Sequence, residues 1–455
     1  MFTAEELDSI IKAYDIRGLV DTEVTPDFVF SLGCAYAKFL EEEREPSTVL
    51  IGEDMRPSSP SLASAFADGI TSQGFDVIRI GLASTDMLYF AAGKLNLPGA
   101  MFTASHNPAE YNGIKLCKSG ARPIGKESGL VRIRDLILNG VPMALRSPGK
   151  STDQPMLGDY VDFLLSLFDA KKIKAARKLK VVIDAGNGMA GFTAPAVMER
   201  LNVELTPIYF ELDGTFPNHE ANPLDPKNMK DLQKKVNAVK ADIGLAFDGD
   251  ADRCFIVDER GELVNPSTLT ALIAVRELER KPGSTIIYNL ISSKAVPEII
   301  EEHGGKPVRS RVGHSYIKKL MAESGAVFGG EHSGHFYFGD FWCADSGMLA
   351  ALFALSELGG SDLPLSQLLA PYDRYIASGE INSKVADTQK SLEDIKAKYQ
   401  SEYPVDDLDG YTVTGPDWWF NVRGSNTEPL LRLNVEADSR ETMERVRDQV
   451  LALIR

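Results

Sequence analysis

Residues 48–83 have the sequence TVLIGEDMRPSSPSLASAFADGITSQGFDVIRIGLA, which alternates two kinds of pattern. Residues 48–54 and 75–83 are short and apolar and favour buried strands. Residues 59–74, between them, favour a helix. A strand, a helix and a second strand in this order are typical of an α/β layer with a mostly parallel sheet.

The same rhythm recurs along the chain. Polar, glycine-rich loops follow apolar strands in four further segments: GAMFTASHNP (99–108), KLKVVIDAGNGMAG (178–191), ADIGLAFDGDADRCFIVDERGELV (241–264) and AVFGGEHSGHFYF (326–338). In open α/β sheets, ligands bind at the carboxyl ends of strands. These loops are therefore candidates for the functional site. Residues 146–155, RSPGKSTDQP, are rich in proline, glycine and serine and indicate a domain boundary.

A different unit begins near Pro371. Residues 418–437 predict two strands around a polar loop. We expect a helix to follow, opened by Asp438 with Glu441 three residues later in capping-box style. Its apolar residues recur at helical spacing and are expected to pack against the core: Met443, Val446, Val450 and Leu453.

Length and charge limit the possible functions. The chain has 455 residues, which suggests about three or four domains. Its composition, 44% hydrophobic and 25% charged, fits a soluble globular protein. A formal net charge of −16 repels phosphates and argues against nucleic-acid binding. An anionic substrate would therefore require cations gathered in one cleft.

The location is expected to be the cytosol. No apolar stretch is long enough to span a bilayer, and MFTAEELDSI lacks the features of a secretory signal. The four cysteines are widely separated and form no CxxC pair, so buried reduced thiols are expected rather than a zinc site or disulfides: Cys34, Cys117, Cys254 and Cys343.

Ser105 is a candidate nucleophile. It lies in TASHNP, where an apolar strand enters a tight turn, with His106 adjacent and Lys115 just beyond. Serine is a weak nucleophile without help. On this segment alone a helix-capping role is the more common one, so the catalytic interpretation depends on a phosphate-handling site elsewhere.

Three aspartates at alternate positions follow the apolar strand IGLAF: Asp248, Asp250 and Asp252, with Arg253 next. Clustered carboxylates require a neutralising cation, and oxygen ligands suit a hard ion such as Mg²⁺. An EF-hand is excluded because Arg253 stands where the loop needs glycine and because strands flank the motif. An aspartyl nucleophile of a phosphatase remains an alternative, and a solvated acidic turn is the less favoured one.

Two later loops could recognise a substrate. Glu331, Ser333 and His335 occupy alternate positions of a glycine-lined loop and could bind adjacent sugar hydroxyls, although a plain hairpin turn is equally probable on this motif alone. The second loop contains an arginine suited to clamp phosphate and donors that could complete an anion nest: Arg423, Gly424, Ser425, Asn426 and Thr427. A loop without function is the competing interpretation.

Smaller segments add cations. Tyr14 and Arg17 lie in YDIRG, Lys294 follows a predicted strand, and His314 precedes two lysines. A lone histidine such as His314 is more often structural than catalytic. The remaining histidines, His219 and His303, lie outside any motif and receive no role.

TASHNP, DGDADR, GEHSGH and RGSNTEP occur in the order and approximate spacing of the α-D-phosphohexomutase superfamily, which the chain resembles over essentially its whole length. YDIRG and SNTEP make it similar to the bacterial phosphomannomutase/phosphoglucomutase branch. One departure is His332, where the dual-specificity enzymes usually have methionine. This difference bears on sugar preference rather than on the general chemistry.

The resemblance implies three related α/β domains with mixed, mostly parallel sheets and a smaller C-terminal α+β domain, around a central cleft. We expect the phosphoserine loop in residues 1–150, the metal loop in 151–255, the sugar-recognition loop in 256–370 and the phosphate-binding loop in 371–455. It also implies that Ser105 carries the phosphoryl group.

The resemblance further implies that the three aspartates and a phosphoserine oxygen hold Mg²⁺, with Arg253 near the transferred group. Glu331 and Ser333 would recognise sugar hydroxyls, and the loop from Arg423 to Thr427 would grip the other phosphate. The family reaction passes through a bound hexose 1,6-bisphosphate, which also serves as primer and must turn round. Lys115 and His314 are both candidates for the general base, and His106 could orient the serine. Arg17, Lys115, Arg253, Lys294 and Arg423 could form one cationic cleft.

The expected function is interconversion of hexose 1-phosphate and hexose 6-phosphate, with mannose or glucose as the sugar. Alternatives are a phosphoglucosamine mutase, a sugar-phosphate phosphatase that uses Asp248, and a sugar-phosphate sensor without activity. The expected partners are small-molecule sugar phosphates, with no nucleic acid and no membrane. The expected oligomeric state is a monomer or a weak homodimer.

Overall fold

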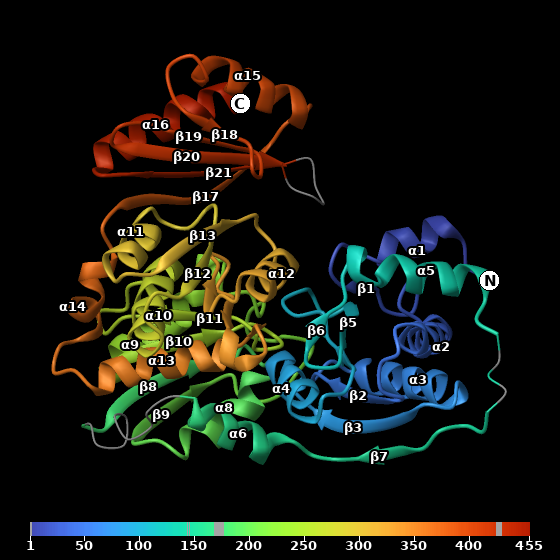
Figure 1. Ribbon diagram of the computed structural model, residues 1–455. Helices are drawn as coiled ribbons and strands as arrows, with labels where there is room; N and C mark the ends of the chain where they lie inside the picture. Colours follow the sequence, from blue (N-terminus) through green and yellow to red (C-terminus); the bar gives the residue numbers. More distant parts are fainter. Residues whose placement is uncertain (1, 143, 145, 168–176, 425–429) are drawn as a thin grey trace. The chain divides into compact units, whose positions relative to one another are not determined.

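A computed structural model describes the chain except for residues 1, 143, 145, 168–176 and 425–429 (Figure 1). The chain divides into two compact units. The first contains residues 1–264 and 333–368, and the second contains residues 265–332 and 369–455. Within the described residues, no helix combines the length and the apolar character required to cross a membrane.

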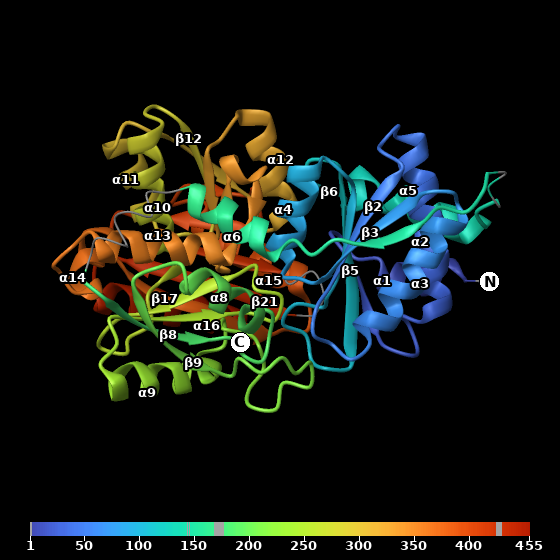
Figure 2. The ribbon, with the colours of Figure 1, turned by 90° about the horizontal axis from the view of Figure 1, so that it is seen from below.

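A seven-stranded sheet organises the N-terminal part of the first unit, with the order β1-β5-β4-β2-β3-β7 and β6 paired to β5. Strands β4, β2, β3 and β7 are parallel, and β5 is antiparallel to β4 and to β1. Figure 2 shows α2 and α3 on one face of this sheet and α4 on the opposite face. The strands are β1 (Ile16–Leu19), β2 (Thr48–Glu53), β3 (Asp76–Leu82), β4 (Gly99–Phe102), β5 (Tyr111–Lys118), β6 (Arg122–Pro123) and β7 (Ser151–Asp153). The helices are α1 (Ala4–Ile10), α2 (Pro26–Glu42), α3 (Ser59–Ser72), α4 (Thr85–Leu95) and α5 (Leu130–Asn139).

The predicted boundary segment 146–155 contains β7, which pairs in parallel with β3. All three residues of β7 are exposed, so no apolar pattern marks this strand. The first sheet therefore extends into the segment in which the sequence predicted a domain boundary.

A four-stranded sheet with the order β11-β10-β8-β9 follows. Its strands are parallel except β11, which is antiparallel to β10. The strands are β8 (Leu179–Asp184), β9 (Val203–Ile208), β10 (Ile243–Phe247) and β11 (Cys254–Val257). The helices are α6 (Leu157–Ser166), α8 (Ala190–Met198) and α9 (Lys230–Val239). The first unit also contains the antiparallel pair β15 (Phe336–Phe338) and β16 (Ala344–Asp345), and the helix α13 (Gly347–Gly359).

The second unit begins with three parallel strands in which β12 is paired to both β13 and β14. The elements are α10 (Pro266–Arg280), β12 (Thr285–Asn289), α11 (Ala295–Glu302), β13 (Lys306–Ser310), α12 (His314–Ser324) and β14 (Phe328–Gly330). The short helix α14 (Leu365–Leu369) precedes the C-terminal sheet in the chain.

An antiparallel sheet with the order β17-β21-β20-β19-β18 ends the chain. Figure 1 shows both C-terminal helices on the same face of this sheet. The elements are β17 (Ile376–Lys384), α15 (Thr388–Tyr399), β18 (Val405–Asp406), β19 (Tyr411–Thr414), β20 (Trp418–Gly424), β21 (Leu430–Ala437) and α16 (Arg440–Ile454).

The predicted cap of α16 was wrong by one residue. The hydroxyl of Ser439, not the carboxylate of Asp438, accepts from the backbone N–H of Thr442. Asp438 instead donates its own N–H to the carbonyl of Asp417 and so belongs to the connection. The predicted packing residues Met443, Val446 and Val450 are buried, while Leu453 is only partly buried against the same core.

The three α/β sheets and the C-terminal α+β part confirm the predicted fold class. The predicted domain boundaries after residues 150, 255 and 370 stay a prediction.

Candidate functional site

Ser105 lies in the loop between β4 and β5 with a left-handed backbone, φ 50°. For a residue with a Cβ, this conformation costs roughly 1–2 kcal/mol and persists only where the surroundings hold it. The hydroxyl of Thr103 accepts from the backbone N–H of Ser105 at 2.9 Å. Ser105 is buried.

The guanidinium of Arg56 is hydrogen-bonded to the backbone of this loop. It donates to four backbone carbonyls at 2.7–3.0 Å, those of Ser105, Asn107, Pro108 and Tyr111. Asp54 lies 3.3 Å from Arg56 Nε, and both side chains are fully buried. Sequence reasoning did not find Arg56. The available signal was a charged pair, Asp54 and Arg56, directly after a buried strand.

The three aspartates lie in the loop between β10 and β11, and all three are buried. This loop passes very close to the loop of Ser105. A Cβ added to Gly249 would lie 2.3 Å from the Ser105 carbonyl oxygen, so only glycine permits the approach. The predicted proximity of Ser105 and the aspartates is therefore present in the first unit.

Asp248 contacts both the serine and the arginine of the motifs. The Ser105 hydroxyl donates to Asp248 Oδ2 at 2.6 Å, and Arg253 Nε donates to the same oxygen at 2.8 Å. Burial raises the pKa of Asp248 to about 7, aided by the charges of Asp252 and Asp250 and opposed by Arg253. A carboxylate at this position is thus costly without additional positive charge.

Lys115 lies between the other two aspartates. Its Nζ donates to Asp250 Oδ2 at 2.7 Å and to Asp252 Oδ2 at 2.6 Å. Burial alone would lower the pKa of Lys115, but the two carboxylates outweigh it and raise this pKa well above its ordinary value. For Asp250 the directions are opposite: burial alone would raise its pKa, but Lys115 and hydrogen bonds hold this pKa below its usual range. Lys115 is therefore an ammonium in this arrangement.

His106 is neutral here. Burial and the charges of Arg253 and Arg17 lower its pKa well below the ordinary value. Arg253 Nη2 lies 2.5 Å from His106 Nδ1, which accepts the hydrogen bond in the neutral ring. Arg17 itself bonds Asp15 at 2.5 Å and the side chain of Asn107. Tyr14, another predicted site residue, is half-buried just before β1.

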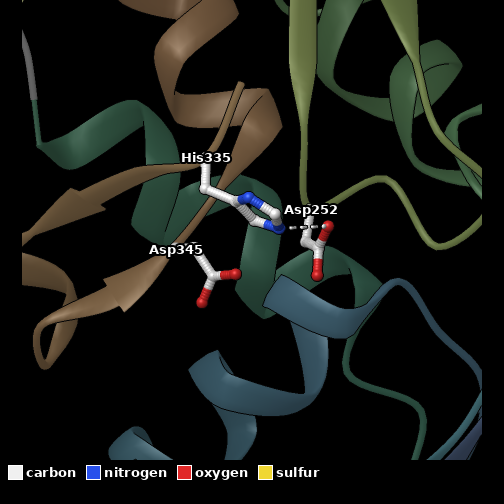
Figure 3. Close-up of side chains that lie close together, drawn as sticks. All are labelled: Asp252, His335 and Asp345. Atoms are coloured by element: carbon white, nitrogen blue, oxygen red, sulfur yellow. Dashed lines mark ion pairs between the residues drawn. The ribbon is translucent and has the colours of Figure 1, made fainter. Parts of the chain in front are cut away.

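His335 lies next to the loop that contains the three aspartates. The Cys254 N–H donates to the Gly334 carbonyl at 3.1 Å, which brings the two loops together. The Nε2 atom of His335 lies 3.5 Å from Asp252 Oδ1, and its Nδ1 lies 2.9 Å from the Ser333 hydroxyl. Figure 3 shows the ring between Asp252 and Asp345, and candidate ligand atoms of these three residues lie within 4.8 Å of one another.

The residues present fit a hard divalent cation. One oxygen from each of Asp248, Asp250 and Asp252 lies within 4.8 Å of the others. The Oδ1 atoms of Asp250 and Asp252 are buried and have no hydrogen-bond partner among the described residues. Carboxylate oxygens are ligands that Mg²⁺ prefers. The set containing His335 offers a nitrogen instead, which suits transition metals better.

The remaining predicted residues lie in the second unit. Glu331 is buried, and its Oε1 accepts from the Gly313 N–H at 3.1 Å. His314 begins α12, but its side chain lies outside the described part of the chain. The backbone N–H of Lys294 donates to Glu436 at 2.9 Å, while its Nζ lies 3.5 Å from Glu298.

Arg423 lies near the end of β20, largely buried. Its Nη2 donates to Glu380 Oε2 at 2.9 Å, and Nη1 of Arg432 lies 3.3 Å from the other oxygen of Glu380. Gly424 ends the strand. The other predicted residues of this loop, Ser425, Asn426 and Thr427, lie outside the described residues.

Comparisons with known proteins agree with these features. Four family models match in chain order: the phosphoglucomutase/phosphomannomutase alpha/beta/alpha domains I, II and III and the C-terminal domain, at residues 8–140, 158–261, 265–375 and 380–453. The phosphomannomutase of Escherichia coli K12 is 40% identical over 94% of this chain and 94% of its own. The phosphomannomutase of Vibrio cholerae is 38% identical, with 96% of each chain covered.

A crystal structure of a phosphoglucomutase/phosphomannomutase family protein from Burkholderia thailandensis superimposes with a TM-score of 0.89 at 31% identity. The match covers 100% of this chain and 97% of the other. The resemblance inferred from the motifs is thus confirmed. The chain belongs to the phosphoglucomutase/phosphomannomutase family and is a mutase.

Proposed function

We propose that this mutase interconverts hexose 1-phosphate and hexose 6-phosphate through a phosphoserine at Ser105. The contact that carries the proposal is the 2.6 Å hydrogen bond from the Ser105 hydroxyl to Asp248. It sets a hydroxyl among three carboxylates and two cations, Lys115 and Arg253. Such a cluster can hold and transfer a phosphoryl group.

Asp248, Asp250 and Asp252 would hold Mg²⁺, together with an oxygen of phosphorylated Ser105. The ion would offset negative charge on the transferring phosphoryl group. Arg253 reaches both Asp248 and the serine, with its Nη2 3.5 Å from the Ser105 Oγ, so it would stabilise the same charge. The neutral ring of His106, 3.3 Å from the Ser105 Oγ, would orient the serine.

A proton must leave the acceptor hydroxyl and later return. Lys115, held as an ammonium between two aspartates, is ready to donate a proton and must lose one before it can accept one. His314 remains the second candidate for the general base. Arg17, which bonds the side chain of Asn107 in the serine loop, would add a cation at the reacting phosphate.

The substrate side uses the remaining predicted residues. Glu331, Ser333 and His335 would recognise sugar hydroxyls, and Tyr14 and Lys294 would also bind the substrate. The loop of Arg423, Gly424, Ser425, Asn426 and Thr427 would grip the phosphate that does not react. A bound hexose 1,6-bisphosphate would turn round between the two transfers, and the same compound would prime the enzyme. One clamp that accepts either end of this intermediate supports such a reorientation.

The proposed sugars are mannose and glucose. The protein would act in the cytoplasm as a monomer or weak homodimer, and it would not bind nucleic acid. Conversion of mannose 1-phosphate, glucose 1-phosphate and glucosamine 1-phosphate, followed by ³¹P NMR with Mg²⁺ and glucose 1,6-bisphosphate, tests the sugar. Dominant activity on the glucosamine compound would favour the phosphoglucosamine alternative. Light scattering during turnover tests the oligomeric state.

Phosphopeptide mapping separates the mutase from a phosphatase. Acid-stable phosphate on Ser105 supports the proposal, and an acyl phosphate on Asp248 with release of inorganic phosphate would overturn it. Ser105→Ala should lower activity by orders of magnitude. Ser356→Ala, which truncates a buried serine of α13, is a matched control and should retain activity. Binding of sugar phosphates without any turnover would instead indicate a sensor.

A further inference from the structure

Thr85 makes two hydrogen bonds to a single residue of the metal loop. It is the first residue of α4 and is fully buried. Its backbone N–H donates to the Asp250 carbonyl at 3.0 Å, and its hydroxyl donates to Asp250 Oδ2 at 2.6 Å. The main chain and the side chain of Asp250 are therefore both fixed by one residue that lies 165 positions earlier.

The start of α4 is itself held firmly. Asp86 accepts hydrogen bonds at 2.5–2.7 Å from three hydroxyls, those of Ser84, Tyr160 and Ser346. All four side chains are fully buried. Tyr160 belongs to α6, and Ser346 is the N-cap of α13. Thr85 thus projects from a point where three helices are tied together, and its hydroxyl has a fixed position.

This geometry determines which oxygen of Asp250 is left available to a cation. Oδ2 accepts from both Thr85 and Lys115, whereas Oδ1 is buried without a hydrogen-bond partner in the described chain. Lys115 also donates to Asp252, so it does not orient Asp250 by itself. The hydroxyl of Thr85 bonds Asp250 and no other carboxylate of the cluster, and it holds the carboxylate without adding charge.

We propose that Thr85 is a positioning residue for the cation site, which holds Asp250 so that Oδ1 faces the ion. The inference rests on the proposed function, because it assumes that the aspartates bind a divalent cation. Partners that orient ligating carboxylates commonly contribute about 10–100-fold to metal affinity. Thr85 is expected to act on cation affinity and not on sugar affinity.

The test is Thr85→Val, which replaces the hydroxyl by a methyl group of similar size. Binding of Mn²⁺ to the full-length protein is titrated by electron paramagnetic resonance without substrate. We expect the Kd to rise by about tenfold or more, and Thr85→Ser to restore it to within about threefold of wild type. In assays, the Mg²⁺ concentration for half-maximal rate should rise, while kcat at saturating Mg²⁺ and KM for the sugar phosphate should change little.

Thr193→Val is the matched control. Thr193 is a buried threonine whose hydroxyl, among the described residues, bonds only the Met189 carbonyl, at 3.3 Å. It should leave Mn²⁺ binding unchanged. Should Thr85→Val not fold, as judged by circular dichroism, Thr85→Ala and Thr85→Ser carry the same titration.

The outcomes separate the inference from the proposed function. Wild-type protein that binds no Mn²⁺ would contradict the proposed metal site. If wild type and Thr85→Val bind Mn²⁺ with equal affinity, the role of Thr85 is overturned and the proposed function stays intact. Equal losses in Thr85→Ser and Thr85→Val would also overturn it, because the serine keeps the hydroxyl.

Discussion

The hydroxyl of Ser105 donates to Asp248 Oδ2 at 2.6 Å, although the two residues are 143 positions apart. Each lies in a loop that leaves a different sheet of the first unit. The contact depends on Gly249, which allows the metal loop to touch the Ser105 carbonyl. The proposed nucleophile and the proposed cation ligands therefore lie on loops that share a close backbone contact, and changes to either loop should affect both.

The charge of Asp248 should make stability depend on pH when no metal is present. Burial raises its pKa from the ordinary 3.8 to about 7. The folded state therefore keeps a proton that the unfolded chain releases, and this contribution to stability is lost as the pH rises from about 4 to about 7. Asp248→Asn should thus gain stability relative to wild type over this range. Thermal unfolding with EDTA measures it.

Adding Mg²⁺ at neutral pH should shift the balance of stability toward the wild-type protein and away from Asp248→Asn. Binding to the folded state stabilises the wild-type protein by mass action, and Asp248→Asn should gain much less because it lacks one ligand. Parallel pH profiles for the two proteins in EDTA would contradict the raised pKa of Asp248. Equal stabilisation by Mg²⁺ would remove Asp248 from the proposed ligand set.

Arg56 should be essential for the conformation of the serine loop. Arg56→Lys keeps the charge, but an ammonium cannot span the four carbonyls that the guanidinium bonds. Breaking a buried ion pair costs about 3–5 kcal/mol, and retention of the charge should reduce this loss. Activity should fall by at least about 100-fold, because misplaced reacting groups are that costly. Mutase assays and thermal unfolding measure the two effects.

Arg79→Lys is the matched control. Arg79 lies in β3 of the same sheet, pairs with Glu53 at 3.1 Å and is partly exposed. The Arg79→Lys variant should lose less than about 1 kcal/mol of its free energy of unfolding and keep its activity. Full activity of Arg56→Lys, with Ser105 phosphorylated as in wild type, would show that the loop holds its shape without the clamp.

Much of the fold could be predicted because its signals are local. The helix predicted at 59–74 is α3, Ser59–Ser72, and the strand predicted at 48–54 is β2, Thr48–Glu53. Both carry apolar periodicity along their own length. Strand β7 carries none, since its residues are exposed and only backbone pairing with β3 defines it. Such an element cannot be found from the sequence pattern.

The site was predictable only in its motif residues. Ser105 and the three aspartates stand in distinctive local patterns, and they do meet in the structure. The guanidinium of Arg56 bonds the Ser105 carbonyl 49 positions away, and Thr85 bonds Asp250 165 positions away. The charged pair of Asp54 and Arg56 signals a buried charge, but nothing near either residue in sequence indicates these distant partners. Ligand atoms of Asp345, Asp252 and His335 lie within 4.8 Å of one another, although Asp252 is distant from the other two in sequence. Motif spacing identifies the chemistry, while the residues that orient it require the fold.

Glu380 should weaken anion binding at Arg423. Its carboxylate accepts from Arg423 and lies beside Arg432, so it neutralises part of their charge. Glu380→Gln should lower the KM for hexose 1-phosphate several-fold at low ionic strength, and the difference should shrink as salt is added. Steady-state kinetics at low and high salt measure this.

A matched control is Glu302→Gln. Glu302 is exposed in the same unit and pairs with Arg374 at 2.6 Å, so its neutralisation changes the net charge equally. It should leave KM unchanged. A higher KM in Glu380→Gln would mean that Glu380 instead holds Arg423 in its binding orientation.

His332 should be dispensable for the chemistry but costly for stability. Burial lowers its pKa, so the ring is neutral, and its Nδ1 is buried without a hydrogen-bond partner among the residues that are described. Leaving such an atom unsatisfied costs about 1–3 kcal/mol. His332→Met should therefore raise the free energy of unfolding by about 1 kcal/mol, as measured by denaturant titration.

The same substitution should also change the ratio of kcat/KM for mannose 1-phosphate and glucose 1-phosphate, because the charges of Glu380 and Arg423 lie near the ring. The value of kcat itself should be little affected. A loss of stability would show that a bound water satisfies Nδ1, and an unchanged ratio would show that residue 332 does not influence the choice of sugar.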